Sequence, residues 1–228
     1  MKSFIDTNIL IAYIFHIDSL HYKANQVFEE YQTIIYSQKV KLEADFVFTK
    51  KRKILQEFFE NLLMETYNKN ANLSSLKDLK KLISNKKFNK MIKGEIKSSL
   101  EPFWVRYVKE QFPKNEIIQQ AIFNCLNNLD IYSFNRKEQI EKRIKITERR
   151  MKPYAKLHKK LKEMDVHHPD DKIILDAHDH NLRINDKLDF ITFDNGFYNR
   201  ILKIKEFSFH DIKGKNDFYT SYRIKNKN

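Results

Sequence analysis

The stretch "FIDTNIL", Phe4 to Leu10, places a carboxylate and two more polar side chains between two apolar segments. Residues 2–6, in which the apolar Phe4 and Ile5 precede Asp6, predict a short strand. Ile9 to Phe15 is apolar enough for a buried helix. The polar residues therefore fall where a strand ends and a helix begins. An aspartate in this place is often only a helix N-cap, so the role of Asp6 depends on the rest of the chain.

The same alternation of strand and helix continues around this stretch and returns near the C-terminus. "TIIYS", 33–37, predicts a second strand, and "QKVKLEADFVF" begins the next helix. After Pro169, "DDKIILDAHDHNL" predicts a helix, "LDFITFD" a strand over 188–194, and "FSFHDI" a last strand. This order is typical of an α/β fold with a central parallel sheet flanked by helices.

The middle of the chain has a different pattern. Segments such as "KILQEFFENLLMETY" and "NEIIQQAIFNCLNNL" carry helical spacing, and only 3 Gly and 4 Pro occur in all 228 residues. We therefore expect a discontinuous α/β core formed by residues 1–50 and 165–214, a basic helical insertion over 51–164, and a polar C-terminal tail over 215–228.

The composition points to a polyanionic partner. The net charge is +13, which favours nucleic acid first and an anionic membrane surface second, although a general bias toward Lys and Asn is the alternative. Cys125 is the only cysteine, which excludes an internal disulfide and a zinc site built of several thiolates. No apolar run approaches the roughly 18 residues of a membrane span. We expect a cytoplasmic protein that does not enter the membrane.

Four acidic positions, far apart in sequence, are expected to meet at one edge of the sheet. Asp6 and Asp194 each end a predicted strand, and Glu43 and Asp171 lie in helices that follow strands. The carboxyl ends of parallel strands share one edge, where α/β proteins form their sites. Unpaired acids there would repel one another, and a divalent cation removes that repulsion. Oxygen ligands alone select a hard ion, Mg²⁺ or Mn²⁺.

These segments also resemble a known family. "FIDTNIL", "YSQKVKLE", "PDDKIILDAHDH" and "FITFDNGF" look like the four acidic motifs of the PIN domain family, over residues 1–50 and about 165–212. Most members of that family are metal-dependent ribonucleases, among them the VapC-like toxins of toxin–antitoxin pairs and rRNA-processing nucleases. The resemblance implies a PIN-like sheet and hydrolysis of RNA phosphodiester bonds that leaves 5′-phosphate and 3′-hydroxyl ends.

The resemblance also assigns residues to roles. The implied catalytic and metal-binding acids are Asp6, Glu43, Asp171 and Asp194. The polar residues expected to support them are Thr7, Asn8 and Asn195. Each acid alone has an ordinary structural explanation as a cap, a solvated helix residue or a turn residue, and their order along the chain favours the site.

The third motif offers three aspartates. Asp170, Asp171 and Asp176 all lie in "DDKIILDA". We favour Asp171 because Ile174 and Leu175 would face the core behind it. Asp176 lies five residues further on and would point roughly 140° away on a helix, and it remains a ligand candidate if the helix is tilted or starts later.

Three alternatives to a metal-dependent ribonuclease stay open. The acids could be structural in a catalytically inactive nucleic-acid-binding module, or the substrate could be DNA, as in flap endonucleases. The chain could also be a toxin held by an antitoxin-like protein, but the small toxins lack the long insertion. The expected partners are accordingly RNA, single-stranded or structured, and an antitoxin-like protein or a second copy of the chain.

The most basic segment of the chain is the expected RNA-binding surface. Arg136 to Lys162 holds twelve Lys or Arg against three Glu, a net +9 of the total +13. Because the acids of the site repel a phosphate backbone, the attraction must come from elsewhere. The residues we assign to it are Lys142, Arg143, Lys145, Arg149, Arg150 and Lys152. The alternative is a solvated helix in a lysine-rich protein.

Replacing Lys142, Arg143, Arg149 and Arg150 together with Gln should weaken RNA binding and flatten its dependence on salt. Each phosphate contact releases condensed counterions. The logarithm of the binding constant therefore falls with the logarithm of the salt concentration, with a slope of about −0.7 per contact for single strands. Binding measured across a salt series tests this, and Mn²⁺ affinity should stay unchanged. Equal RNA affinity and equal salt slope in the variant and the wild type would establish the solvated-helix alternative.

Overall fold

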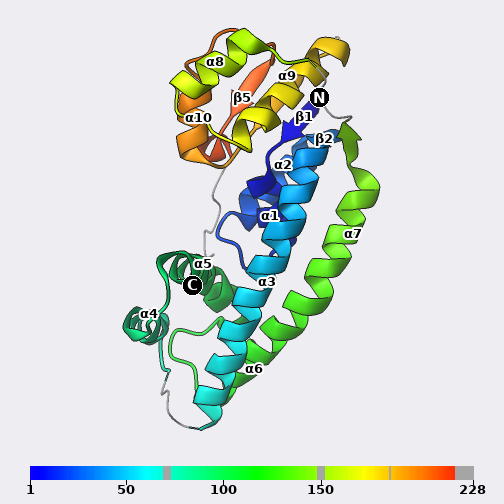
Figure 1. Ribbon diagram of the computed structural model, residues 1–228. Helices are drawn as coiled ribbons and strands as arrows, with labels where there is room; N and C mark the ends of the chain where they lie inside the picture. The colour runs from blue at the N-terminus through cyan, green and yellow to red at the C-terminus, as the bar shows by residue number, and fades with distance from the viewer. Residues whose placement is uncertain (69–72, 148–151, 185, 219–228) are drawn as a thin grey trace, which may run out of the picture. The chain divides into compact units, whose positions relative to one another are not determined.

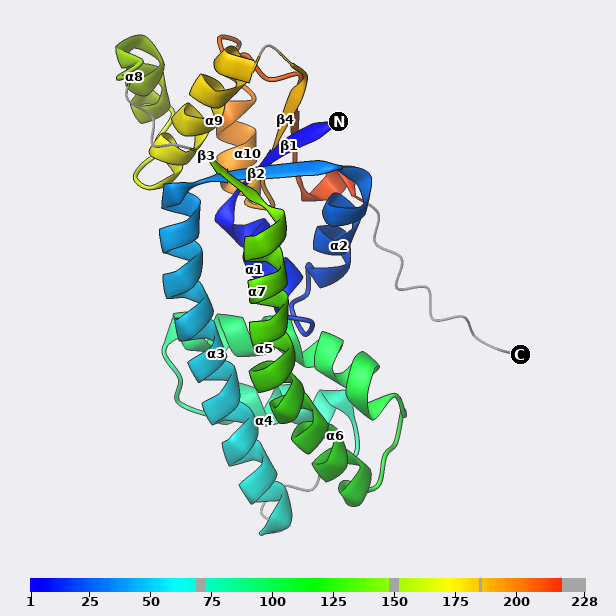
Figure 2. The ribbon, with the colours of Figure 1, turned by 90° about the vertical axis from the view of Figure 1, so that its right-hand side faces the viewer.

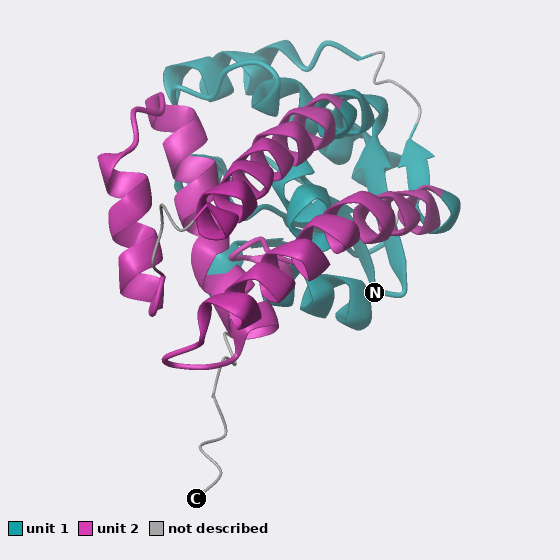
Figure 3. Ribbon diagram, turned by 90° about the horizontal axis from the view of Figure 1, so that it is seen from below, with its two compact units in different colours: residues 1–13, 22–45, 142–228 teal, residues 14–21, 46–141 magenta. Residues whose placement is uncertain are grey.

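The computed structural model describes residues 1–68, 73–147, 152–184 and 186–218. They form two compact units, shown in two colours in Figure 3. The first, which we call the α/β unit, comprises residues 1–13, 22–45 and the chain from 142 onward. The second, the helical unit, comprises residues 14–21 and 46–141. Each is described separately below.

A five-stranded sheet forms the centre of the α/β unit. Its strands are β1 Lys2–Ile5, β2 Thr33–Ser37, β3 Lys145–Thr147, β4 Leu188–Ile191 and β5 Asp211–Lys213. Their spatial order is β3-β2-β1-β4-β5, and every neighbouring pair is parallel. The central strands β1, β2 and β4 are almost entirely buried, as expected for a parallel sheet covered on both faces.

Helices flank the sheet. Those of the α/β unit are α1 Thr7–Ile14, α2 His21–Glu30, the first turns of α3 Gln38–Tyr67, α8 Ala155–Glu163, α9 Asp170–Ile184 and α10 Asn195–Ile201. α9 packs on β2 and β4, and α8 packs on α9 (Figure 2). A short 3₁₀ helix, Lys215–Asp217, follows β5. The predicted α/β class, with a parallel sheet flanked by helices and a helical insertion, is confirmed.

Phenylalanine fills much of the core beneath these helices. The Phe190 ring stacks with Phe4 and Phe209 at centroid distances of 6.1 and 5.4 Å, and meets Phe197 edge-on at 5.9 Å. Stacked and edge-on ring pairs add to the stabilisation that burial provides. The core thus ties β1 and β4, the two strands that carry the candidate site, to α10.

The helical unit contains the rest of α3 and four further α-helices (Figure 1). These helices are α4 Leu76–Asn85, α5 Lys90–Phe103, α6 Asn115–Asn127 and α7 Ser133–Arg143. Two short π-helical segments, η1 Trp104–Val108 and η2 Asn128–Tyr132, follow α5 and α6. Inside the unit, the buried Lys51 pairs with Asp18 at 2.7 Å and with Glu95 at 2.9 Å, so its charge is compensated.

The structure differs from the sequence-based expectations in three places. β3 lies inside the segment predicted to be helical, where "KIT" is too short and too exposed to give a clear strand pattern. The last strand, predicted in "FSFHDI" over 207–212, forms at Asp211–Lys213. The helical unit includes residues 14–21 and 46–50, which were expected in the α/β core. It ends at Glu141 and not at residue 164, because β3 pairs with β2 and α8 packs on α9.

None of the helices in the described ranges is long and apolar enough to cross a membrane.

Candidate active site

The order of the strands creates a switch point at the carboxyl edge of the sheet. β1 is central, with β2 on one side and β4 on the other. The chain therefore builds the sheet outward from β1 on one side through β2 and β3, and on the other side through β4 and β5. Such switch points are where open α/β sheets bind ligands. Ile5 is in register with Ile191, and the Asp6 backbone N–H donates to the Ile191 carbonyl at 3.1 Å. Asp6 therefore lies at this switch point.

Three hydrogen-bond donors fix the carboxylate of Asp6, which is only 4% exposed. Its Oδ1 accepts from the Thr7 backbone N–H at 2.7 Å. Its Oδ2 accepts from Asn8 Nδ2 and from Thr192 Oγ1, both at 2.7 Å. Asn8 Oδ1 also accepts from the Phe193 N–H at 3.0 Å, so Asn8 joins the start of α1 to the end of β4. The polar residues of "DTN" thus orient the acid as well as start the helix.

Glu43 and Asp194 are connected to the same network through two threonines. Thr7 Oγ1 donates to Glu43 Oε2 at 2.7 Å. Thr192 Oγ1 accepts from the Asp194 N–H at 3.2 Å, while Asp194 caps α10 by accepting from the Phe197 N–H at 2.9 Å. Thr7 and Asn8 thus contact Glu43 and Asp6 through their side chains, whereas Asn195 is exposed at the start of α10.

Burial and mutual repulsion raise the pKa of Asp6. Its value rises to about 7, first because burial penalises the charged form and then because Asp170 and Glu43 repel it. The hydrogen bonds from Thr192 and Thr7 act in the opposite direction. The carboxyl thus keeps a raised pKa although it receives three donors, because burial and, after it, the charges of Asp170 and Glu43 outweigh those hydrogen bonds.

Asp170 lies in the same environment. Burial and, after it, the charges of Glu43, Asp194 and Asp171 together raise its pKa to about 6, against an opposing effect of Arg200. Asp6 and Asp170 therefore repel each other and share Glu43 as a neighbour. Repulsion between their charges therefore links four acids, from the ends of β1 and β4 and the starts of α3 and α9.

The third motif is arranged differently from our expectation. Asp171 turns toward α8, where its Oδ2 lies 2.8 Å from His158 Nε2, and it is 5% exposed. Successive helix residues point about 100° apart, so one aspartate faces α8 while its neighbour Asp170 faces the acids. Asp176 is buried further along α9, and its charge is not among those with the largest effects on the pKa of Asp6 or of Asp170. The geometry thus favours Asp170, where the sequence pattern favoured Asp171.

The donor set suits a hard cation, but the described side chains are not drawn together around one. Among them, no group of three or more His, Cys, Asp or Glu could hold a metal ion as placed. The converging donors are all carboxylate oxygens, which Mg²⁺ and Mn²⁺ prefer. Glu43 is half-buried and Asp194 is exposed, so both side chains have room to turn toward Asp6. The chemistry of the site therefore fits such an ion.

Two contributors were missed in the sequence. Thr192 lies in "ITFD" between the strand and Asp194, and a hydroxyl residue at a strand end next to an acid was the available signal. His158 has no local motif and is found only through the packing of α8 on α9.

The predicted basic surface belongs in part to the α/β unit. Lys142, Arg143, Lys145 and Lys152 are all exposed there. Arg149 and Arg150 lie outside the described residues.

Comparisons with protein families, with curated proteins and with solved structures found no match for this chain.

The raised pKa of Asp6 predicts a specific dependence of stability on pH. Between its ordinary value of 3.8 and about 7, the folded state binds more protons than the unfolded state, so the free energy of unfolding falls as pH rises through this window. The asparagine in Asp6→Asn cannot titrate, so the variant lacks this pH-dependent contribution to the free energy of unfolding. In metal-free buffer, the unfolding free energy of the variant minus that of the wild type should therefore increase with pH, by at most about 1.4 kcal/mol per pH unit.

Urea denaturation from about pH 5 to about pH 8 measures this difference. A difference that stays constant over the window would mean that Asp6 keeps an ordinary pKa in the folded state.

Proposed function

We propose that the chain is a metal-dependent endoribonuclease whose site is formed by Asp6, Glu43, Asp170 and Asp194. The observation that carries the proposal is the burial and mutual repulsion of acids at the switch point of a parallel sheet, which raise the pKa of Asp6 to about 7 and that of Asp170 to about 6. Buried acids with perturbed pKa values in a crevice are typical of functional sites. Keeping several carboxylates together has a cost that a bound Mg²⁺ or Mn²⁺ offsets.

A bound Mg²⁺ or Mn²⁺ would activate a water molecule and stabilise the charge that develops on the phosphoryl oxygens. The residues that would hold it are Asp6, Glu43, Asp170 and Asp194. The chain itself supplies orientation: Asn8 and Thr192 fix Asp6, and Thr7 fixes Glu43. His158 holds Asp171 away from the cluster and so determines which aspartate of α9 faces it.

RNA is the substrate that the charge distribution supports. The acids repel a phosphate backbone, whereas the exposed Lys142, Arg143, Lys145 and Lys152 of the same unit attract it, and the whole chain carries +13. A cytoplasmic location accords with such a substrate. DNA and an inactive binding module are the outcomes against which the enzyme proposal is tested.

Asp6→Asn and Asp194→Asn should each reduce Mn²⁺-dependent cleavage of RNA by more than about 100-fold, since even residues that only support a metal ligand cost 10–100-fold. Asp170→Asn should reduce it more than Asp171→Asn, because only Asp170 faces the other acids. Single-turnover cleavage of single-stranded RNA, structured RNA and flap DNA, measured side by side, gives these rates.

Asp186→Asn is the matched control. Asp186 pairs with Lys2 at 2.8 Å at the start of β1, which is the opposite edge of the sheet, and its loss should leave cleavage unchanged. Wild-type rates in both Asp6→Asn and Asp194→Asn would rule out the metal site. RNA binding without cleavage in the wild type would establish the inactive module, and preferential cutting of flap DNA would reassign the substrate.

A further inference from the structure

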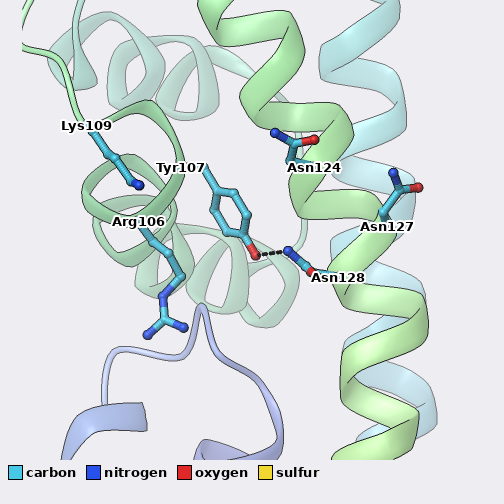
Figure 4. A pocket seen from close by; sticks show the side chains of 6 residues that line it. All are labelled: Arg106, Tyr107, Lys109, Asn124, Asn127 and Asn128. Atoms are coloured by element: carbon cyan, nitrogen blue, oxygen red, sulfur yellow. Dashed lines mark hydrogen bonds between the residues drawn. The ribbon is translucent and has the colours of Figure 1, made fainter.

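The helical unit contains a pocket that has no part in the site of the α/β unit. It has a volume of about 350 Å³ and is lined by Arg106, Tyr107, Lys109, Asn124, Asn127 and Asn128. Figure 4 shows the first three side chains on one wall, from η1 and the residue that follows it, and the three asparagines on the other, from α6 and the start of η2. Pockets of about 300–1,000 Å³ hold small ligands, and this one lies at the lower limit.

The lining is cationic and rich in carboxamides. Two of the six residues carry a positive charge, three are asparagines, and no acidic residue is among those described as lining the pocket. Within the described ranges, neither Arg106 nor Lys109 has a hydrogen bond or an ion pair through its side chain, so both cationic heads are available. Arginine and lysine bind phosphate, and asparagine pairs with the edges of nucleobases.

A chain of hydrogen bonds fixes the aromatic wall. Asn128 Nδ2 donates to the Tyr107 hydroxyl at 3.0 Å, and that hydroxyl contacts Nε2 of the buried His16. Burial lowers the pKa of His16 to about 3, with the charges of Arg106, His21 and Arg136 adding to the effect, so the imidazole is neutral and can accept from Tyr107. The phenol ring therefore has a set position, and such a ring can stack on a base.

The backbone around the pocket is unusual on both walls. Arg106 and Tyr107 lie in the π-helical segment η1, and Asn128 begins the second such segment, η2. Lys109 has a φ of 62°, in the left-handed region that residues other than glycine seldom adopt. π-helical turns occur frequently at functional sites, and a left-handed lysine is a strained residue that the surrounding structure must hold. Both features place lining side chains at the pocket.

We propose that this pocket binds a single nucleotide through its phosphate and its base, the source being either a free nucleoside monophosphate or an unpaired nucleotide of an RNA strand. Arg106 and Lys109 contact the phosphate, and the Tyr107 ring packs on the base. Asn124 and Asn127 contact the polar edges of that base. The pocket is too small for a duplex. Because the test measures binding only, its outcome does not depend on the nuclease proposal.

Calorimetric titration of the full chain with adenosine 5′-monophosphate tests the pocket, with adenosine and inorganic phosphate as partial probes. We expect the monophosphate to bind at one site and more tightly than either partial probe. Arg106→Gln with Lys109→Gln should weaken its binding at least about tenfold, because two charge-assisted contacts are lost. Asn127→Asp, which adds a negative charge at an exposed lining position, should weaken it as well.

Lys77→Gln with Lys97→Gln is the matched control. Both lysines are exposed in the same unit, make no ion pair in the described structure and lie outside the pocket, so the variant loses the same charge and should keep wild-type affinity. Competition with labelled single-stranded RNA then separates the two sources. Displacement of the RNA by the monophosphate assigns the pocket to an RNA nucleotide, and binding without displacement assigns it to a free nucleotide.

Two results would overturn the proposal. One is that the monophosphate does not bind and that the pocket variants leave RNA affinity unchanged. The other is that the control pair weakens binding as much as the pocket pair, which would mean that general positive charge and not the pocket attracts the ligand.

Discussion

The burial of the Asp6 carboxylate at the end of β1 is the constraint on which the α/β unit depends. A buried acid needs hydrogen-bond donors, and here they come from Thr7, Asn8 and Thr192, which belong to the start of α1 and the end of β4. The same donors therefore hold one acid and join two segments that are 184 or more residues apart in sequence. Structure and site are stabilised by one set of contacts, yet the raised pKa of Asp6 shows that these contacts do not fully compensate its charge.

The strand order turns this local arrangement into a common site. With β1 between β2 and β4, the helices that follow these strands all begin at one edge. Glu43 enters from α3 after β2, and Asp194 enters from the turn after β4. A different order would separate the acids, because side chains that follow distant strands of a sheet do not meet. The mutual repulsion of Asp6 and Asp170 records their proximity.

The sequence predicted the parts of this arrangement that depend on local pattern. The strands at 2–6 and 33–37 were found within one residue, and Asp6, Glu43 and Asp194 each lie just after a strand or in the first turns of the helix that follows one. Their roles as metal ligands stay predictions. The choice between Asp170 and Asp171 depends on where α9 begins and on His158 from α8, and both are set by packing. β3 was not predicted, because an edge strand of three residues is too short to show the alternation of apolar and polar residues that marks a strand. The pocket lined by Arg106 and Tyr107 was not predicted because it is built on two π-helical segments, which spacing rules for α-helices do not predict.

The central claim is that the four acids form a cation site. Soaking crystals of the chain in Mn²⁺ and measuring its anomalous scattering tests this most directly. The account predicts a peak at the carboxyl edge of the sheet, with oxygens of Asp6, Asp170 and at least one of Glu43 and Asp194 at about 2.1 Å, close to the distance for Mg²⁺. It also predicts that the peak disappears in Asp6→Asn. A peak coordinated by Asp171 and His158, or no peak at this edge in the wild type, would contradict it.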